Sequence, residues 1–176
     1  MGNVPSVPGF PVFLESVMSR KAMSSSEENS VRITFRLDRD EDGYPPSDWE
    51  RLWATRLPDG SYEIDNLPFY VRDISLGDRV SAKYISGELH FEKLLIPSRN
   101  SIVRVLVKRT DQVEFFRAAL RAMGVESEVS DLPRMFAALL PPDINVHKVL
   151  EFLDERADSG EISFEEAAVR YQQSII

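Results

Sequence analysis

The feature that most constrains the fold is a change in hydrophobic periodicity near residue 100. Before that point apolar and polar residues alternate, as in VRITFRL at 31–37, and a period of two is typical of half-buried strands. After it, the stretches 111–124 and 145–160 carry apolar residues at helical spacing. A chain that changes period in this way is expected to build two differently organised units, which makes its fold class α+β.

The first unit, residues 30–100, is predicted to be a small β-barrel. Asp59-Gly60 and Ser86-Gly87 each separate two apolar runs, and such dipeptides favour tight hairpins. Closure removes exposed strand edges, so short strands joined by tight turns favour a closed or half-open barrel. Trp53 is expected in the barrel core, where Trp53→Ala would cost about 3–5 kcal/mol.

The second unit, residues 101–176, is predicted to follow the order β-α-β-β-α-β of a ferredoxin-like sandwich. Its first helix is expected to begin with a capping box of Asp111 and Glu114 and to end at Gly124. Asn145 is expected to cap the second helix. The sequence has no flexible linker near residue 100, so the two units are expected to pack together.

Residues 1–29 are predicted to form a disordered leader. SSSEENS follows Met23, and prolines interrupt the apolar patch before it. Met18 and Met23 are both possible translation starts. The opening lacks the basic n-region of a signal peptide, so a cytoplasmic location is expected.

Composition excludes several functional classes. The chain has no cysteine, which rules out disulfides, thiolate metal sites and cysteine nucleophiles. Its formal charge is −8, and no basic run stands out, so nucleic-acid binding is disfavoured. No apolar run reaches the roughly 20 residues of a membrane span. A basic protein partner suits an acidic chain of this kind better than nucleic acid or a membrane.

Asp38, Asp40, Asp42 and Gly43 match the front half of a calcium-binding loop. The loop position that should supply a bidentate carboxylate is Trp49, so a solvated acidic turn is favoured over a metal site. No metal and no cofactor are expected. The two histidines have no acid or nucleophile at a revealing spacing, and no catalytic residue is assigned.

Several motifs at fixed spacing resemble a bacterial family known as domain of unknown function 4265. They are Gly43-Tyr44-Pro45-Pro46, Glu50-x-Leu52-Trp53-Ala54, Tyr62, Ile64-Asp65-Asn66 with Pro68-Phe69, Gly77-Asp78 with Val80, the strand around Arg104, and Pro141-Pro142. The resemblance covers roughly residues 31–170 and implies no activity. Ile102 and Val103 stand where the family pattern leads us to expect a threonine. Small bacterial proteins of this kind resemble immunity proteins encoded beside toxin genes.

The leading hypothesis is a non-enzymatic binding protein, an immunity or inhibitor protein that occludes a basic, toxin-like protein. The alternative is a regulatory module that binds a small molecule at the junction of barrel and sandwich. An enzyme that uses scattered carboxylates is the third and weakest hypothesis. The expected partner- or ligand-binding residues are Tyr62, Asp65, Asn66, Tyr70, Asp78 and Arg104. The other interpretation of the Asp and Asn residues is that their side chains satisfy the backbone of turns.

Overall fold

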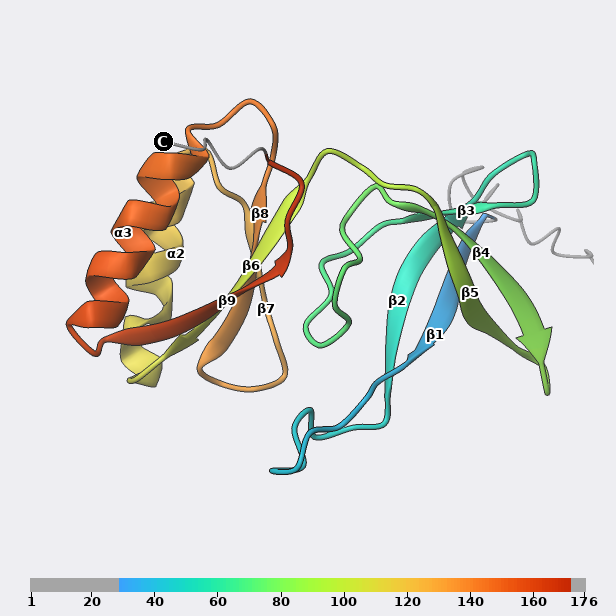
Figure 1. The fold of residues 1–176 in the computed structure, drawn as a ribbon, viewed down its shortest axis with the longest axis horizontal. Coiled ribbons are helices and arrows are strands. Elements are labelled where there is room, and N and C mark those ends of the chain that lie inside the picture. Colours follow the sequence, from blue (N-terminus) through green and yellow to red (C-terminus); the bar gives the residue numbers. More distant parts are fainter. Residues whose placement is uncertain (1–28, 172–176) are drawn as a thin grey trace, which may run out of the picture.

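The computed structural model describes residues 29–171 and shows an α+β protein with a closed barrel and a second sheet (Figure 1). The prediction of a disordered leader, except for Asn29, and both candidate start residues fall outside the described range. Figure 1 shows the barrel on one side of the second sheet and two helices on the other.

Five short strands close the barrel, as the turn spacing predicted. They are β1 (Ser30–Arg36), β2 (Trp49–Arg56), β3 (Tyr62–Ile64), β4 (Arg79–Ile85) and β5 (Glu88–Ile96). Successive strands pair antiparallel, and β1 closes the barrel by pairing parallel with β5. The β4–β5 turn has φ +51° at Ser86 and +88° at Gly87, both in the left-handed region that a two-residue hairpin of type I′ needs.

The prediction that Trp53 lies in the barrel core is wrong. Leu52 and Ala54 point inward and are fully buried, while Trp53 points outward and is 43% exposed. Its ring lies beneath the Arg32 guanidinium, 4.3 Å from the centroid. Residues alternate between two faces along 51–57, but neither face is wholly apolar, so the sequence pattern does not identify the inner one. In the structure Leu52 and Ala54 lie on the inner face.

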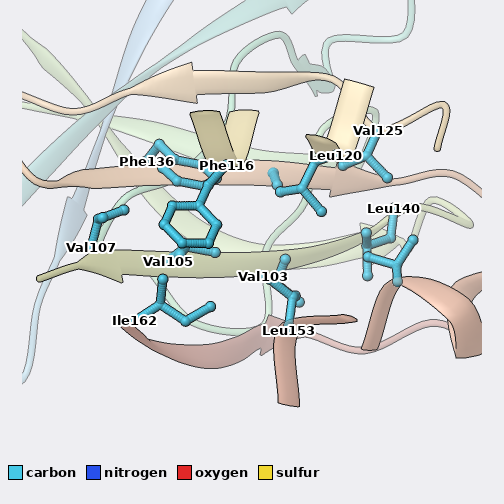
Figure 2. Close-up of a cluster of buried hydrophobic side chains, with 12 residues drawn as sticks. Val103, Val105, Val107, Phe116, Leu120, Val125, Phe136, Leu140, Leu153 and Ile162 are labelled. Carbon is cyan, nitrogen blue, oxygen red and sulfur yellow. The ribbon is translucent and has the colours of Figure 1, made fainter. Parts of the chain in front are cut away.

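The second sheet has the strand order β7-β8-β6-β9 and consists of β6 (Ser101–Val107), β7 (Ser127–Val129), β8 (Met135–Leu140) and β9 (Ile162–Ala168). A short 3₁₀ helix, η1 (Thr110–Gln112), precedes α2 (Val113–Arg121), and α3 (Val146–Asp158) follows β8. Figure 2 shows how Val103, Val105 and Val107 on β6 meet Phe116 of α2 and Leu153 of α3. Alternation along β6 therefore leaves Ile102, Arg104 and Leu106 on the face without helices.

The predicted helix ends are partly right. Asn145 caps α3, because its Oδ1 accepts a hydrogen bond from Lys148 N at 3.1 Å. The predicted capping box of Asp111 and Glu114 is wrong: α2 starts after η1 with Gln112 as its N-cap, and no side chain caps it. Asp111 instead pairs with Arg109, at 2.6 Å.

The acidic stretch between β1 and β2 forms a tight turn. Asp40 Oδ1 accepts hydrogen bonds from Asp42 N at 3.0 Å and Tyr44 N at 2.8 Å. Arg39 Nη2 donates to Gly43 O at 3.1 Å, which closes the turn on itself. The stretch is therefore a turn, as predicted, and the Asp40 carboxylate binds the backbone donors of that turn.

Candidate functional site at the junction of barrel and sheet

The loop at 65–78 lies between the barrel and the helix-free face of the second sheet (Figure 1). Leu67 from this loop is buried in one cluster with Ile102, Ala137 and Ala167 of the sheet. Asp73 N donates to Ala167 O at 2.9 Å, so backbone hydrogen bonding also links the loop to β9. The 65–78 loop therefore connects the barrel to the second sheet.

Glu50 of β2 holds one part of the loop from the barrel side. Its Oε1 accepts from Phe69 N at 2.6 Å, and its Oε2 accepts from Tyr70 N at 2.9 Å and Val71 N at 2.7 Å. Hydrogen bonds to an ionised acceptor are among the stronger ones in proteins. Glu50 therefore fixes the backbone of three consecutive loop residues.

Asp78 holds the other end of the loop. It is fully buried, and it accepts from Ser75 N at 2.8 Å and Ser98 N at 2.6 Å. Arg170, beyond β9, lies 3.4 Å from the same carboxylate. A buried charge requires hydrogen bonds and a countercharge, and Asp78 has both. This predicted site residue thus joins the loop, the connection to β6 and the end of the second sheet.

Arg104 of β6 approaches the loop from the sheet. Its side chain is 3% exposed and forms an ion pair with Glu165 at 2.9 Å. It also donates to the carbonyl oxygens of Tyr70, at 3.2 Å, and Val71. The Arg104 Nε is buried and has no hydrogen-bond partner among the described residues. The Nε atoms of Arg79, Arg156 and Arg170 are likewise buried and unpaired within residues 29–171, but among these four arginines Arg104 alone lines the cavity at the junction.

The other predicted binding residues, Tyr62, Asp65 and Asn66, do not line one common site. Asn66 Oδ1 accepts from Trp53 N at 2.7 Å, so Asn66 binds the edge of β2. Tyr62, one of the expected binding residues, is buried in the barrel core and offers no surface to a partner. Asp65 is exposed and donates its backbone N–H to Trp53 O at 2.9 Å. These residues support the barrel and the loop rather than lining a common hollow.

Tyr70 does lie at the junction. Its hydroxyl donates to Asp131 Oδ1 at 3.3 Å, and its ring meets Tyr44 edge to face with centroids 6.0 Å apart. Burial, together with the Asp131 carboxylate, raises the pKa of Tyr70 to about 12. Burial and the nearby Glu165 carboxylate also raise the pKa of Tyr44. Both phenols are therefore neutral hydrogen-bonding groups at physiological pH.

Two hollows meet at Tyr44. A junction cavity of about 280 Å³ lies against the helix-free sheet face, where its lining includes Tyr44, Arg104, Leu106, Leu132, Met135 and Glu165. A second hollow of about 620 Å³ lies towards the barrel, between the 70–74 part of the loop and the ends of β1 and β5. The ring of Tyr44, carried by the acidic turn, is common to both walls.

Tyr70 and Arg104, which the sequence predicted as binding residues, lie at the junction. Tyr44, Glu50 and Glu165 also lie there, but they were not among the predicted binding residues. Glu50 shares its inward face with Leu52 and Ala54, so a carboxylate on the inner face of a strand was the available signal. Glu165 carried no signal, because carboxylates are common throughout the chain. Among the described residues, no group of His, Asp or Glu side chains gathers in a way that could hold a metal ion.

The family comparison fits this geometry. The family described as "Domain of unknown function (DUF4265)" matches residues 50–164, more than half of the chain. The chain belongs to this family. The match begins at Glu50 and includes Asp78 and Arg104, the charged residues that hold the 65–78 loop.

A solved structure from Neisseria gonorrhoeae, titled as a novel crystal structure of a hypothetical protein, has a similar fold. It superposes with a TM-score of 0.68 at 18% sequence identity and covers 81% of this chain and 97% of that chain. At this identity the likeness concerns the fold alone. No curated protein matches the chain. Within the described residues, no helix has the length and apolar character that crossing a membrane requires.

Proposed function

We propose that this protein is a non-enzymatic binding protein whose ligand occupies the junction cavity. The observation that carries this proposal is the Arg104 side chain, which lines the cavity and keeps a buried Nε without a partner among residues 29–171. Buried donors are usually satisfied in proteins, and a ligand acceptor or an ordered water in the cavity would satisfy this one. The proposal corresponds to a regulatory module at the barrel–sandwich junction.

The lining of the cavity indicates the chemistry of the ligand. Leu106, Leu132 and Met135 provide an apolar wall, and the Tyr44 ring provides an aromatic one. Polar groups are few, as is usual in small-molecule sites. The best fit is a small molecule with an apolar body and one carbonyl or carboxylate acceptor for Arg104. Glu165 does not repel such an acceptor strongly, because both Arg104 and Arg72 pair with it, each at 2.9 Å.

A library of small aromatic and aliphatic carboxylic acids and amides tests the proposal by ligand-observed NMR. Leu106→Trp should fill the cavity and abolish binding, since Leu106 lines it and is 42% exposed. Leu95→Trp is the matched control, because Leu95 is 43% exposed on β5 and does not line the cavity. Compounds that bind both variants equally well, or a library without any binder, would count against a ligand at this place.

Two finer assignments accompany this proposal. The ferredoxin-like arrangement of residues 101–168 is supported by the strand order β7-β8-β6-β9, with α2 after the first strand and α3 after the third. The immunity or inhibitor role in the cytoplasm is favoured by the net charge of −8, which suits a basic partner. Co-expression with the product of a neighbouring toxin gene tests it: failure to restore growth contradicts that role and leaves the cavity proposal standing.

A further inference from the structure

A basic and aromatic surface covers the outer side of β1 and β2. We call it the outer face and define it by Arg32, Arg36, Trp49, Arg51 and Trp53. The register sets Arg32 opposite Trp53 and Arg36 opposite Trp49, so cations and indoles alternate across the two strands. The chain contains two tryptophans, and both lie here, 46% and 43% exposed. An indole half in water is costly for a small barrel, which points to a partner.

The side chains of the outer face hold one another in place. Arg51 pairs with Glu88 at 2.7 Å, and Arg32 stacks on Trp53. Trp49 meets His90 edge to face, with centroids 5.7 Å apart. Ordered side chains lose less entropy on association, and Trp and Arg are enriched among residues that dominate protein interfaces. Arg36 is exposed, and it takes part in none of the ion pairs among the described residues.

The acidic turn at 38–48 lies directly beside the outer face and projects from the barrel (Figure 1). Its internal hydrogen bonds to Asp40 leave Asp38, Glu41, Asp42 and Asp48 exposed. A hollow of about 460 Å³ separates turn and face, and Arg36, Asp38, Asp48 and Trp49 are among the residues that line it. One end of the barrel thus presents an acidic projection next to a cationic aromatic surface.

We propose that this surface is the interface of a two-fold symmetric dimer, in which the acidic turn of each copy occupies the outer face of the other. In a two-fold interface the same patch meets itself, so a patch must carry both halves of each complementary pair. The acidic turn and the outer face meet that condition, because their opposite charges lie side by side on one barrel. The occupant is therefore a second copy of this chain.

Sedimentation velocity and tryptophan fluorescence of the full chain test this inference. We expect a dimer at low salt that dissociates as salt rises, since the Debye length shortens from about 30 Å at 0.01 M to about 3 Å at 1 M. Dissociation should change the emission of both tryptophans, which report on the outer face alone. A chain that stays monomeric at hundred-micromolar concentration in low salt overturns the proposal.

Charge reversal makes the test specific. The face variant Arg32→Glu with Arg36→Glu, and the turn variant Asp38→Lys with Asp42→Lys, should each weaken self-association at least tenfold. An equimolar mixture should restore it, because each variant then meets a complementary surface in the other. Wild-type association in either variant, or a mixture that remains monomeric, refutes the assigned interface.

Lys148→Glu on α3 is the control, because it replaces a cation by an anion, as each substitution of the face variant does, at an exposed residue outside the barrel. It should leave the dimer unchanged, and a dimer lost in this control would show that only net charge matters. A monomer whose fluorescence responds to single-stranded oligothymidylate or to an acidic peptide would identify a different occupant and overturn the dimer.

Discussion

Replacement of Glu50 should test the account of the junction most directly. In Glu50→Ala the backbone N–H groups of Phe69, Tyr70 and Val71 all lose their acceptor. A hydrogen bond to a charged group contributes about 1.5–3 kcal/mol, and partial access of water to the loop reduces the sum. We expect a loss of about 4 kcal/mol in the free energy of unfolding, a large fraction of the stability of an ordinary domain.

Glu50→Gln should be an intermediate case. Its amide oxygen can replace Oε2 and keep the bonds from Tyr70 N and Val71 N, but the amide nitrogen then faces Phe69 N, donor against donor. The free energy of unfolding should fall by about 2 kcal/mol, because one charge-assisted hydrogen bond is lost and the other two become weaker.

Urea denaturation followed by circular dichroism measures both losses, and amide exchange at residues 69–71 localises them. Glu63→Ala is the matched control, because Glu63 is an exposed glutamate on the neighbouring strand β3. Its effect should stay within about 0.5 kcal/mol. If Glu50→Ala is as stable as Glu63→Ala, the carboxylate does not hold the loop and our account of the junction fails.

Three further predictions concern single side chains. Trp53→Ala should lower the free energy of unfolding by about 1 kcal/mol or less, since an exposed cation–π contact contributes little. Leu52 is fully buried, and Leu52→Ala should cost about 2–5 kcal/mol. Equal losses for the two variants in denaturation would place the indole in the core. Tyr70 has a folded-state pKa raised to about 12, so its contribution to stability is full below its unfolded pKa of about 10 and is lost as pH rises through about 12. Asp131→Asn should lower that pKa in part, because burial is the larger cause, and an unchanged ultraviolet titration would contradict the contact. Asn145→Ala should cost about 1 kcal/mol in thermal unfolding by removing the α3 cap, and Asn145→Asp should retain most of it.

Local sequence signals predicted the elements of the fold. Alternation around Ile33 and Phe35, the Ser86-Gly87 turn and the Asn145 cap are each encoded within a few residues, and the structure has all three. The failed capping box at Asp111 shows the limit of such signals. Arg109 supplies that carboxylate with a stronger, charged partner, and the first turn of the helix tightens into η1 instead.

The junction was less predictable because its contacts join residues far apart in sequence. Asp78 looked like a turn former, and it is one through Ser75, but its bond to Ser98 depends on how the chain returns to the barrel. Arg104 was marked by a motif, yet its partners lie on the 65–78 loop and on β9. Only the assembled barrel and sheet bring these groups together.

The way the 65–78 loop is held bears on how proteins of this family can be recombined. The loop belongs to the barrel in chain order, but Leu67, Asp73 and the Arg104 contacts connect it to the second sheet. A chimera that exchanged parts at residue 100 would set one parent's loop against the other parent's sheet. A chimera should therefore take Glu50, the 65–78 loop and the second sheet from the same parent. The point at which the two parents are joined then lies before Glu50, within the barrel.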